Sequence, residues 1–216
     1  MGDSTQLSDL PVHAFLERLG SSDPVPGGGS AAALASAMGA ALVAMVAELM
    51  IGRPAYAEHE ATLRHLRFDA LERRTELMSL AQDDATAYDV VVRARHMPKD
   101  SEAERAARTS ALQEAMKEAA RIPLRAAVVA SEVLDLAARI APIGNRNAAS
   151  DAGVAAQLAA AGLRGALLNV RINLPHLADD EPLRQSAPAE IARLERLATT
   201  GEKSALATVD QQLAPK

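Results

Sequence analysis

The chain has no cysteine and no tryptophan, and only two tyrosines and two phenylalanines among its 216 residues. The absence of cysteine excludes a disulfide framework, a thiolate nucleophile and cysteine-ligated zinc or iron–sulfur sites. The scarcity of aromatic side chains argues against a β-sandwich or β-barrel, because strands are enriched in aromatic and β-branched residues. Alanine is abundant instead, at 48 residues, and it is the strongest helix former. The composition therefore predicts an all-α protein.

The charges are dispersed along the chain, with 23 basic and 28 acidic residues and a net charge of −5. No basic block alternates with aromatics, so nucleic acid is not expected as a partner. The first residues lack the basic start and apolar run of a signal peptide, which favours a cytoplasmic protein. The five histidines show no metal-ligand spacing, so no metal site is expected. The length suits one domain over residues 1–216.

Residues 30–51 form the one long apolar run, with Glu48 as its only formal charge. A run of this length is long enough to span a bilayer. It is mostly alanine, serine and glycine, however, and insertion into membranes favours leucine, isoleucine, phenylalanine and valine. We therefore interpret it as a central core helix, with a membrane span as the alternative. Small residues at Ser36, Gly39, Ala40 and Ala44 would let another helix or a second subunit approach closely.

Apolar spacing and helix-breaking residues predict five to seven helices and no strand. Ser101 and Glu104 form a capping pattern that should open one of the helices. Pro123 should kink or restart that helix, because proline lacks the backbone N–H. The other helices are expected over residues 8–19, from about residue 30 to 51, 57–96, from Asn147 or Ser150 to Asn173, and 188–213.

Asp84 falls on an apolar helical stripe, whereas its neighbour Asp83 is turned about 100° away. The stripe follows the spacing of one helix face: Leu77, Leu80, Ala81, Asp84, Tyr88 and Val91. A carboxylate on a buried face must be paired, hydrogen-bonded or functional. Asp84 is therefore either a structural ion-pair partner or a functional residue.

A second helix face repeats this anomaly with three polar side chains and two glycines. Its residues are Asp151, Val154, Leu158, Gly162, Gly165, Asn169 and Asn173. Glycines permit close approach by another helix or by a flat ligand. The face is thus either a tight helix crossing or part of a binding site.

The segment Pro24-Val25-Pro26-Gly27-Gly28-Gly29-Ser30 leads directly into the predicted central helix. Glycines at a helix N-terminus leave backbone N–H groups free to face a ligand. No Gly-Lys-Ser/Thr sequence follows and no strand precedes, which argues against a nucleotide-binding loop. The loop is either a ligand contact or only a sharp connection.

These segments together resemble the cyclodeaminase/cyclohydrolase family, which includes the C-terminal half of formiminotransferase-cyclodeaminase and stand-alone methenyltetrahydrofolate cyclohydrolases. The likeness covers residues 8–200 and has one departure: residues 52–56 keep Tyr56 but have a single arginine. The matching segments are the Pro-Gly loop, Asp83-Asp84-Ala85-Thr86-Ala87-Tyr88 with Met97-Pro98-Lys99, Gly144-Asn145-Arg146-Asn147 with Ser150-Asp151-Ala152-Gly153-Val154, and Asn169-Val170-Arg171-Ile172-Asn173.

The resemblance implies an all-α homodimer that binds a tetrahydrofolate derivative, without a further cofactor, in a cleft near the subunit interface. It implies hydrolysis of 5,10-methenyltetrahydrofolate, with formiminotetrahydrofolate cyclodeaminase as the alternative reaction. A non-catalytic folate-binding or scaffold dimer is the alternative of another class, favoured by the altered residues 52–56.

On this reading Asp84 acts at the reacting carbon, with Lys99 as its partner, and Asp151 is able to exchange roles with Asp84. The expected substrate-binding residues are Gly27, Gly28, Gly29, Ser30, Tyr56, Asp151, Asn169 and Asn173.

Overall fold

The computed structural model describes residues 6–143 and 145–214, and within them it contains six α-helices and no strand. The helices are α1 (Val12–Leu19), α2 (Gly28–Glu48), α3 (Glu60–Arg95), α4 (Glu102–Ile140), α5 (Ala149–Asn173) and α6 (Pro182–Leu213). The predicted all-α fold is confirmed. Gly144, the first residue of one family-like segment, lies outside the described residues.

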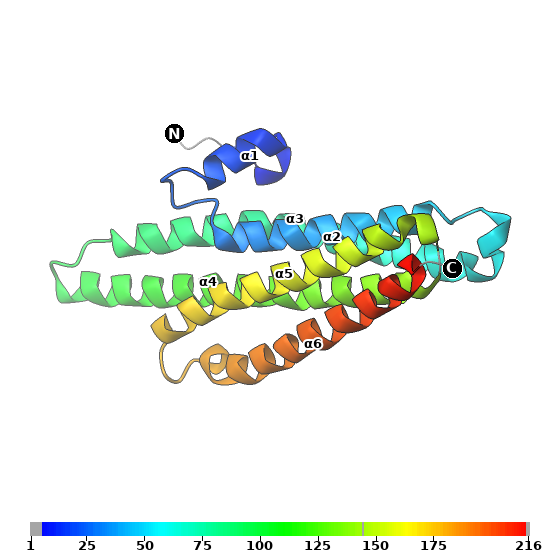
Figure 1. Ribbon diagram of the computed structural model, residues 1–216. Coiled ribbons are helices and arrows are strands. Elements are labelled where there is room, and N and C mark those ends of the chain that lie inside the picture. Colours follow the sequence, from blue (N-terminus) through cyan, green and yellow to red (C-terminus); the bar gives the residue numbers. More distant parts are fainter. Residues whose placement is uncertain (1–5, 144, 215–216) are drawn as a thin grey trace.

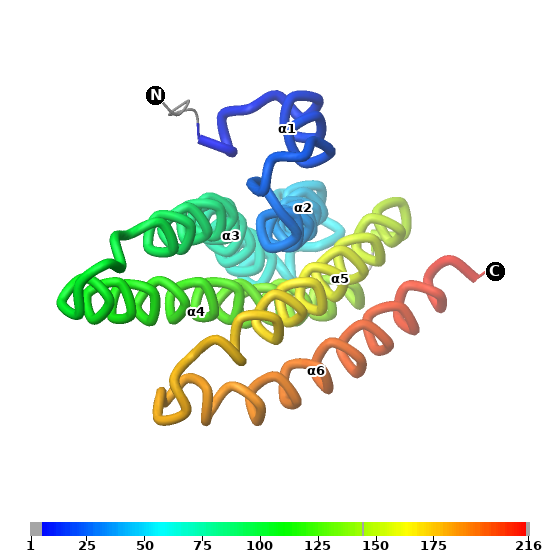
Figure 2. Tube along the Cα trace, turned by 90° about the vertical axis from the view of Figure 1, so that its left-hand side faces the viewer, coloured from blue at the N-terminus to red at the C-terminus, as the bar shows by residue number. Residues whose placement is uncertain are grey.

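The five long helices pack side by side as an antiparallel bundle (Figures 1 and 2). α2 lies against α3, α4 and α5, and α6 covers α4 and α5. Successive helices run in opposite directions, so the start of α2 shares one end of the bundle with the ends of α3 and α5. The predicted central position of the apolar helix is therefore correct.

α2 and α5 cross closely because small residues face each other along their contact. A Cβ atom added at Gly162 would overlap the Ser36 hydroxyl, and one at Gly39 would lie 2.8 Å from the carbonyl oxygen of Ala155. Ser36 is fully buried and donates to the carbonyl of Ala32. Part of the predicted polar seam on α5 is thus a tight helix crossing.

α4 continues through Pro123 as a single helix, so the predicted restart at that residue is wrong. Pro188 likewise lies inside α6 instead of opening it. The predicted capping box is confirmed: Ser101 accepts a hydrogen bond from the backbone N–H of Glu104, and the Glu104 carboxylate accepts from the N–H of Ser101.

Two segments, Gly28–Glu48 and Arg146–His176, are long and apolar enough to cross a membrane. More than half of each apolar window is buried within the bundle, as in the core helices of soluble proteins.

Several large apolar side chains on α2 and α5 are exposed. They follow helical spacing and comprise Met38 and Met45 on α2, Leu49 directly after its end, and Val154, Leu168 and Ile172 on α5. We call this set the apolar face. α1 stands off the bundle (Figure 2), and its Val12 and Leu16 are also exposed.

Candidate active site

A cleft of about 320 Å³ lies at the end of the bundle where α2 begins and α5 ends. This end faces the viewer in Figure 2. Four helices and the Pro-Gly loop contribute its walls, and the lining residues are Pro24, Val25, Gly27, Gly28, Gly29, Asp84, Tyr88, Val91, Arg95, Met116, Ala119, Asn169, Ile172, Asn173 and His176.

The glycine turn at the start of α2 packs directly against two polar side chains of the cleft. A Cβ atom on Gly29 would overlap the carboxylate of Asp84. A Cβ atom on Gly28 would lie 3.7 Å from the side-chain nitrogen of Asn169, an ordinary contact. Gly29 is therefore required for the α2 backbone to approach the Asp84 carboxylate so closely.

Ser30 orients Asp84 from behind the cleft. Its hydroxyl lies 2.8 Å from the carbonyl oxygen of Ala81, to which it donates, and 3.4 Å from Oδ2 of Asp84. The backbone N–H of Ser30 also donates to the Asp84 carboxylate. Ser30 is fully buried, so it contacts Asp84 and does not line the cleft.

Asp84 is a partly buried carboxylate without a salt-bridge partner among the described residues. Burial raises the pKa of Asp84 above its ordinary value, and the hydrogen bonds from Ser30 offset this only in part. Desolvation of this kind makes a carboxylate more basic. Asp84 is therefore not the ion-pair partner that the sequence left as one alternative. It is a proton acceptor at a cleft large enough for a ligand.

Asn169 and Asn173 lie one helical turn apart on α5 and both line the cleft. The amide nitrogen of Asn169 donates to the carbonyl of Gly165, one turn earlier, at 2.9 Å. The amide nitrogen of Asn173 donates across the bundle to the carbonyl of Ala119 on α4 at 2.7 Å. Each amide is thus fixed through its nitrogen, which leaves its oxygen as an acceptor for a ligand.

The Ala119 carbonyl is free to accept this bond because of Pro123. In a regular helix the carbonyl of residue 119 accepts from the N–H of residue 123, and proline has no N–H. Asn173 takes the place of the missing donor. Pro123 therefore makes it possible for Ala119 to hold the Asn173 side chain, while α4 continues through this residue.

Three of the predicted site residues, described next, do not line the cleft of this chain. Lys99 is exposed in the α3–α4 connection, at the same end of the bundle but outside the lining. Asp151 is in the first turn of α5, about 27 Å along the helix from Asn169. Tyr56 follows the far end of α2. Gly27, Gly28, Gly29, Asp84, Asn169 and Asn173 are brought together.

Arg95 and His176 line the cleft although the sequence reasoning did not select them. Arg95 follows Val91 by four residues and so continues the stripe that contains Asp84. His176 follows Asn173 by three residues and continues the other stripe. Extending the first stripe to the end of α3 would have found Arg95, whereas His176 lies beyond the end of α5, in the short helix Leu174–His176.

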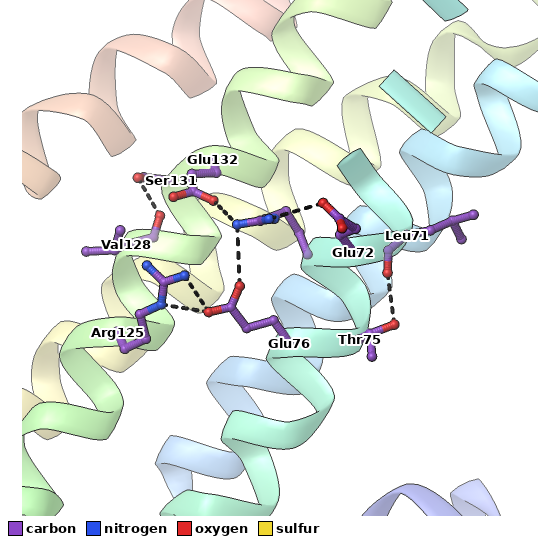
Figure 3. Close-up of polar contacts among 9 residues, drawn as sticks. Leu71, Glu72, Thr75, Glu76, Arg125, Val128, Ser131 and Glu132 are labelled. Carbon is purple, nitrogen blue, oxygen red and sulfur yellow. Dashed lines mark hydrogen bonds and ion pairs between the residues drawn. The ribbon is translucent and has the colours of Figure 1, made fainter. Parts of the chain in front are cut away.

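A larger groove of about 830 Å³ lies between α3, α4 and α6. Four of its five charged side chains are already paired: Arg73 contacts Glu132 at 2.8 Å, and Arg139 contacts Asp135 at 3.5 Å. Next to the groove, Arg125 binds Glu76 (Figure 3). Charges neutralised in this way make the groove a poorer candidate for chemistry than the cleft with Asp84.

Within residues 6–143 and 145–214, no three histidine, aspartate or glutamate side chains form a group that would hold a metal ion. The cleft itself offers a basic carboxylate, two oriented amides, an arginine and a histidine.

Comparisons with known proteins identify the family of the chain. A sequence model described as Formiminotransferase-cyclodeaminase matches residues 11–193. The chain is 47% identical over 168 residues to the methenyltetrahydrofolate cyclohydrolase of Methylorubrum extorquens, covering 78% of this chain and 81% of that one. It is 36% identical over 179 residues to the formimidoyltransferase-cyclodeaminase of Rattus norvegicus, covering 83% of this chain and 33% of that longer protein.

The fold has a solved counterpart as well. The formiminotetrahydrofolate cyclodeaminase of Thermotoga maritima matches with a TM-score of 0.84 at 28% sequence identity, covering 95% of this chain and 98% of that one. The resemblance indicated by the sequence segments is thereby confirmed, and the chain belongs to the formiminotransferase-cyclodeaminase family.

Proposed function

We propose that the protein is a methenyltetrahydrofolate cyclohydrolase, which hydrolyses 5,10-methenyltetrahydrofolate to 10-formyltetrahydrofolate. The observation that carries the proposal is the basic, unpaired carboxylate of Asp84 in a ligand-sized cleft. The 47% identity to a named cyclohydrolase over most of both chains supports the choice of reaction.

Asp84 is suited to both steps of this hydrolysis. Its negative charge stabilises the cationic methenyl carbon, and as a general base it takes a proton from the attacking water. A carbon–oxygen bond forms and gives a neutral tetrahedral adduct. Asp84 then returns the proton to N5 as the carbon–N5 bond breaks, and the adduct hydroxyl loses its proton to solvent as it becomes the formyl carbonyl.

The other cleft residues position the substrate. Asn169 and Asn173 present amide oxygens to the donor edge of the pterin ring. The backbone at Gly27, Gly28 and Gly29 forms the adjacent wall, where no side chain obstructs a flat ring. Lys99 lies in the connection beyond α3 and outside the cleft lining, so a role as the partner of Asp84 requires that this connection move.

We propose in addition that the protein is a homodimer that associates through the apolar face. Ile172 belongs to this face and also lines the cleft, so the interface would border the site. α2 and α5 run antiparallel, and a two-fold axis across their middle places the far end of one bundle beside the cleft end of the other. The partner's Asp151 and the partner's Tyr56 then complete the cleft.

A mixing experiment tests the shared site. Asp84→Asn and Asp151→Asn chains are each expected to be inactive, and co-expression with two affinity tags yields mixed dimers. The unfractionated mixture should have about a quarter of wild-type turnover, because about half of its dimers are mixed and each mixed dimer holds one intact site. Mixed dimers isolated through both tags should have about half of wild-type turnover. Turnover in the mixture no higher than the mean of the two parents would contradict a site shared between chains.

The activity itself is tested by loss of the near-ultraviolet absorbance of 5,10-methenyltetrahydrofolate against buffer hydrolysis. We expect Asp84→Asn to reduce kcat by a factor on the order of 10² to 10⁴, the range for removal of a general base. Asp83→Asn is the matched control, since Asp83 is exposed and lies outside the cleft lining. Equal turnover in the wild type and in Asp84→Asn would refute the role of Asp84.

The second candidate reaction is formiminotetrahydrofolate cyclodeamination, favoured by the fold of the Thermotoga maritima protein. Release of ammonia from formiminotetrahydrofolate, without acceleration of methenyltetrahydrofolate hydrolysis, would select it. Tight folate binding with neither turnover would select a non-catalytic binding protein.

We also propose that the protein works in the cytoplasm, without a membrane, a metal or a dissociable cofactor. Purification in the absence of detergent and full turnover after dialysis against a chelator are the expected results. A requirement for detergent would instead assign the two apolar segments to a bilayer.

A further inference from the structure

The cleft is elongated, with unlike charges at its two ends. Along α3 its lining residues are Asp84, Tyr88, Val91 and Arg95, which share one helix face. Asp84 and Arg95 are eleven residues apart, or about 16 Å along the helix axis. The apolar portions of Tyr88, Val91 and Ile172 lie between these ends.

Arg95 is a cation without a carboxylate partner within ion-pair distance in the part of the chain that the structure describes. Other arginines of the bundle, such as Arg73 and Arg121, are paired with glutamates. Residues 90–99 contain three cations and no acidic residue. The backbone around Arg95 is held in place, because its carbonyl accepts a 3.2 Å hydrogen bond from Nε of Arg108 on α4.

We propose that Arg95 binds the glutamate carboxylates of the folate substrate, with His176 as a second donor on the facing wall. This inference rests on the proposed function. The substrate has its cationic carbon at one end and its carboxylates at the other, separated by an aromatic ring. The cleft has the complementary order: the carboxylate of Asp84, an apolar middle and the guanidinium of Arg95, whose fork matches carboxylate geometry.

The test compares two substrates that differ only at the tail: 5,10-methenyltetrahydrofolate and 5,10-methenyltetrahydropteroate, which lacks the glutamate. Arg95→Gln is expected to raise KM for the folate about tenfold, in line with loss of a charge-assisted bond, and to change kcat less than about twofold. For the pteroate, whose remaining carboxylate is attached directly to the aromatic ring and so lies short of the glutamate position, the rise in KM should be clearly smaller. Arg93→Gln is the matched control, an exposed arginine of the same helical turn that does not line the cleft.

Two results would overturn the assignment: an equal rise in KM for both substrates, which indicates a structural effect, or no rise for the folate. If the wild-type protein hydrolyses neither substrate, the proposed function fails and the anion site is tested separately. Calorimetric titration with p-aminobenzoyl-glutamate should then give tighter binding to the wild type than to Arg95→Gln. Equal affinities would refute the site itself.

Discussion

Asn173 donates a hydrogen bond to the carbonyl oxygen of Ala119, a residue 54 positions earlier on a different helix. That carbonyl lacks its usual donor because residue 123 is proline. A residue that ordinarily breaks a helix therefore supplies the anchor for a side chain in the cleft. The hydrogen bond also links α4 to the end of α5, where the cleft opens.

Replacing Pro123 tests this anchor. Pro123→Ala restores the backbone N–H and the internal hydrogen bond of α4, which frees the Asn173 amide. We expect a KM three- to tenfold higher, on the order of one neutral hydrogen bond, while the helical circular dichroism is retained. Combining Pro123→Ala with Asn173→Ala should add nothing to Asn173→Ala alone.

The matched control for this substitution is Pro188→Ala in α6, an internal helix proline outside the cleft. It should leave KM unchanged. Additive effects of Pro123→Ala and Asn173→Ala would show that the two residues act independently.

The contact between Gly29 and Asp84 leads to a second prediction. Gly29→Ala forces the new methyl group against the carboxylate, so either the α2 backbone or Asp84 must move. We expect a loss of about 1–3 kcal/mol of stability, the usual cost of overpacking, and a large loss of kcat. Gly28→Ala, whose Cβ meets only an ordinary contact, is the control for stability in thermal unfolding. Equal melting temperatures for the two variants would contradict the tight contact.

The raised pKa of Asp84 has a consequence for stability. A carboxyl group whose pKa is higher in the folded state stabilises the fold fully below its unfolded pKa of about 3.9, and this contribution is lost as pH rises through the folded pKa. At pH 7 the charged group therefore costs stability. Asp84→Asn should raise Tm at pH 7 by roughly 2–4 °C, the shift that about 1 kcal/mol produces in a chain of this size.

The gain in Tm should shrink as the pH falls through the folded pKa of Asp84, because the wild-type carboxyl group is then neutral as well. A lower Tm for Asp84→Asn at pH 7 would show that the carboxylate stabilises the fold, contrary to its desolvation.

Titration of the side-chain carboxyl carbon by ¹³C nuclear magnetic resonance measures the same property directly. The Asp84 resonance, identified by its absence in Asp84→Asn, should titrate at a higher pH than is usual for aspartate, because burial disfavours the charged form. kcat/KM should fall on the acid side with the same midpoint, since the protonated carboxyl group cannot accept a proton from water. A midpoint at or below the usual aspartate range would be inconsistent with a desolvated site.

Asp84, Asn169 and Asn173 could be identified from the sequence because each interrupts an apolar stripe with helical period. That pattern depends only on local geometry, which α3 and α5 keep. Asp151 lies on the same stripe of α5 as Asn169, but eighteen residues of helix separate the two by about 27 Å. Sharing a face of a helix is therefore insufficient to bring two residues into one cleft of one chain.

Pro123 and the role of Arg95 show what could not be predicted. The partner that makes Pro123 compatible with a continuous helix comes from α5, so no local rule reveals it. Arg95 lies on the stripe, but sequence alone could not distinguish an unpaired arginine in a cleft from the many arginines that pair with glutamates on the bundle surface.

The close crossing of α2 and α5 has a mechanical consequence. Gly39 and Gly162 leave almost no side-chain volume between the two backbones, so the helices cannot slide without backbone collision. This rigid pair forms walls of the cleft and also carries the apolar face, and Ile172 belongs to both. If the proposed dimer forms at that face, a ligand whose affinity depends on dimerisation must change the strength of association by the same factor as association changes the affinity for the ligand.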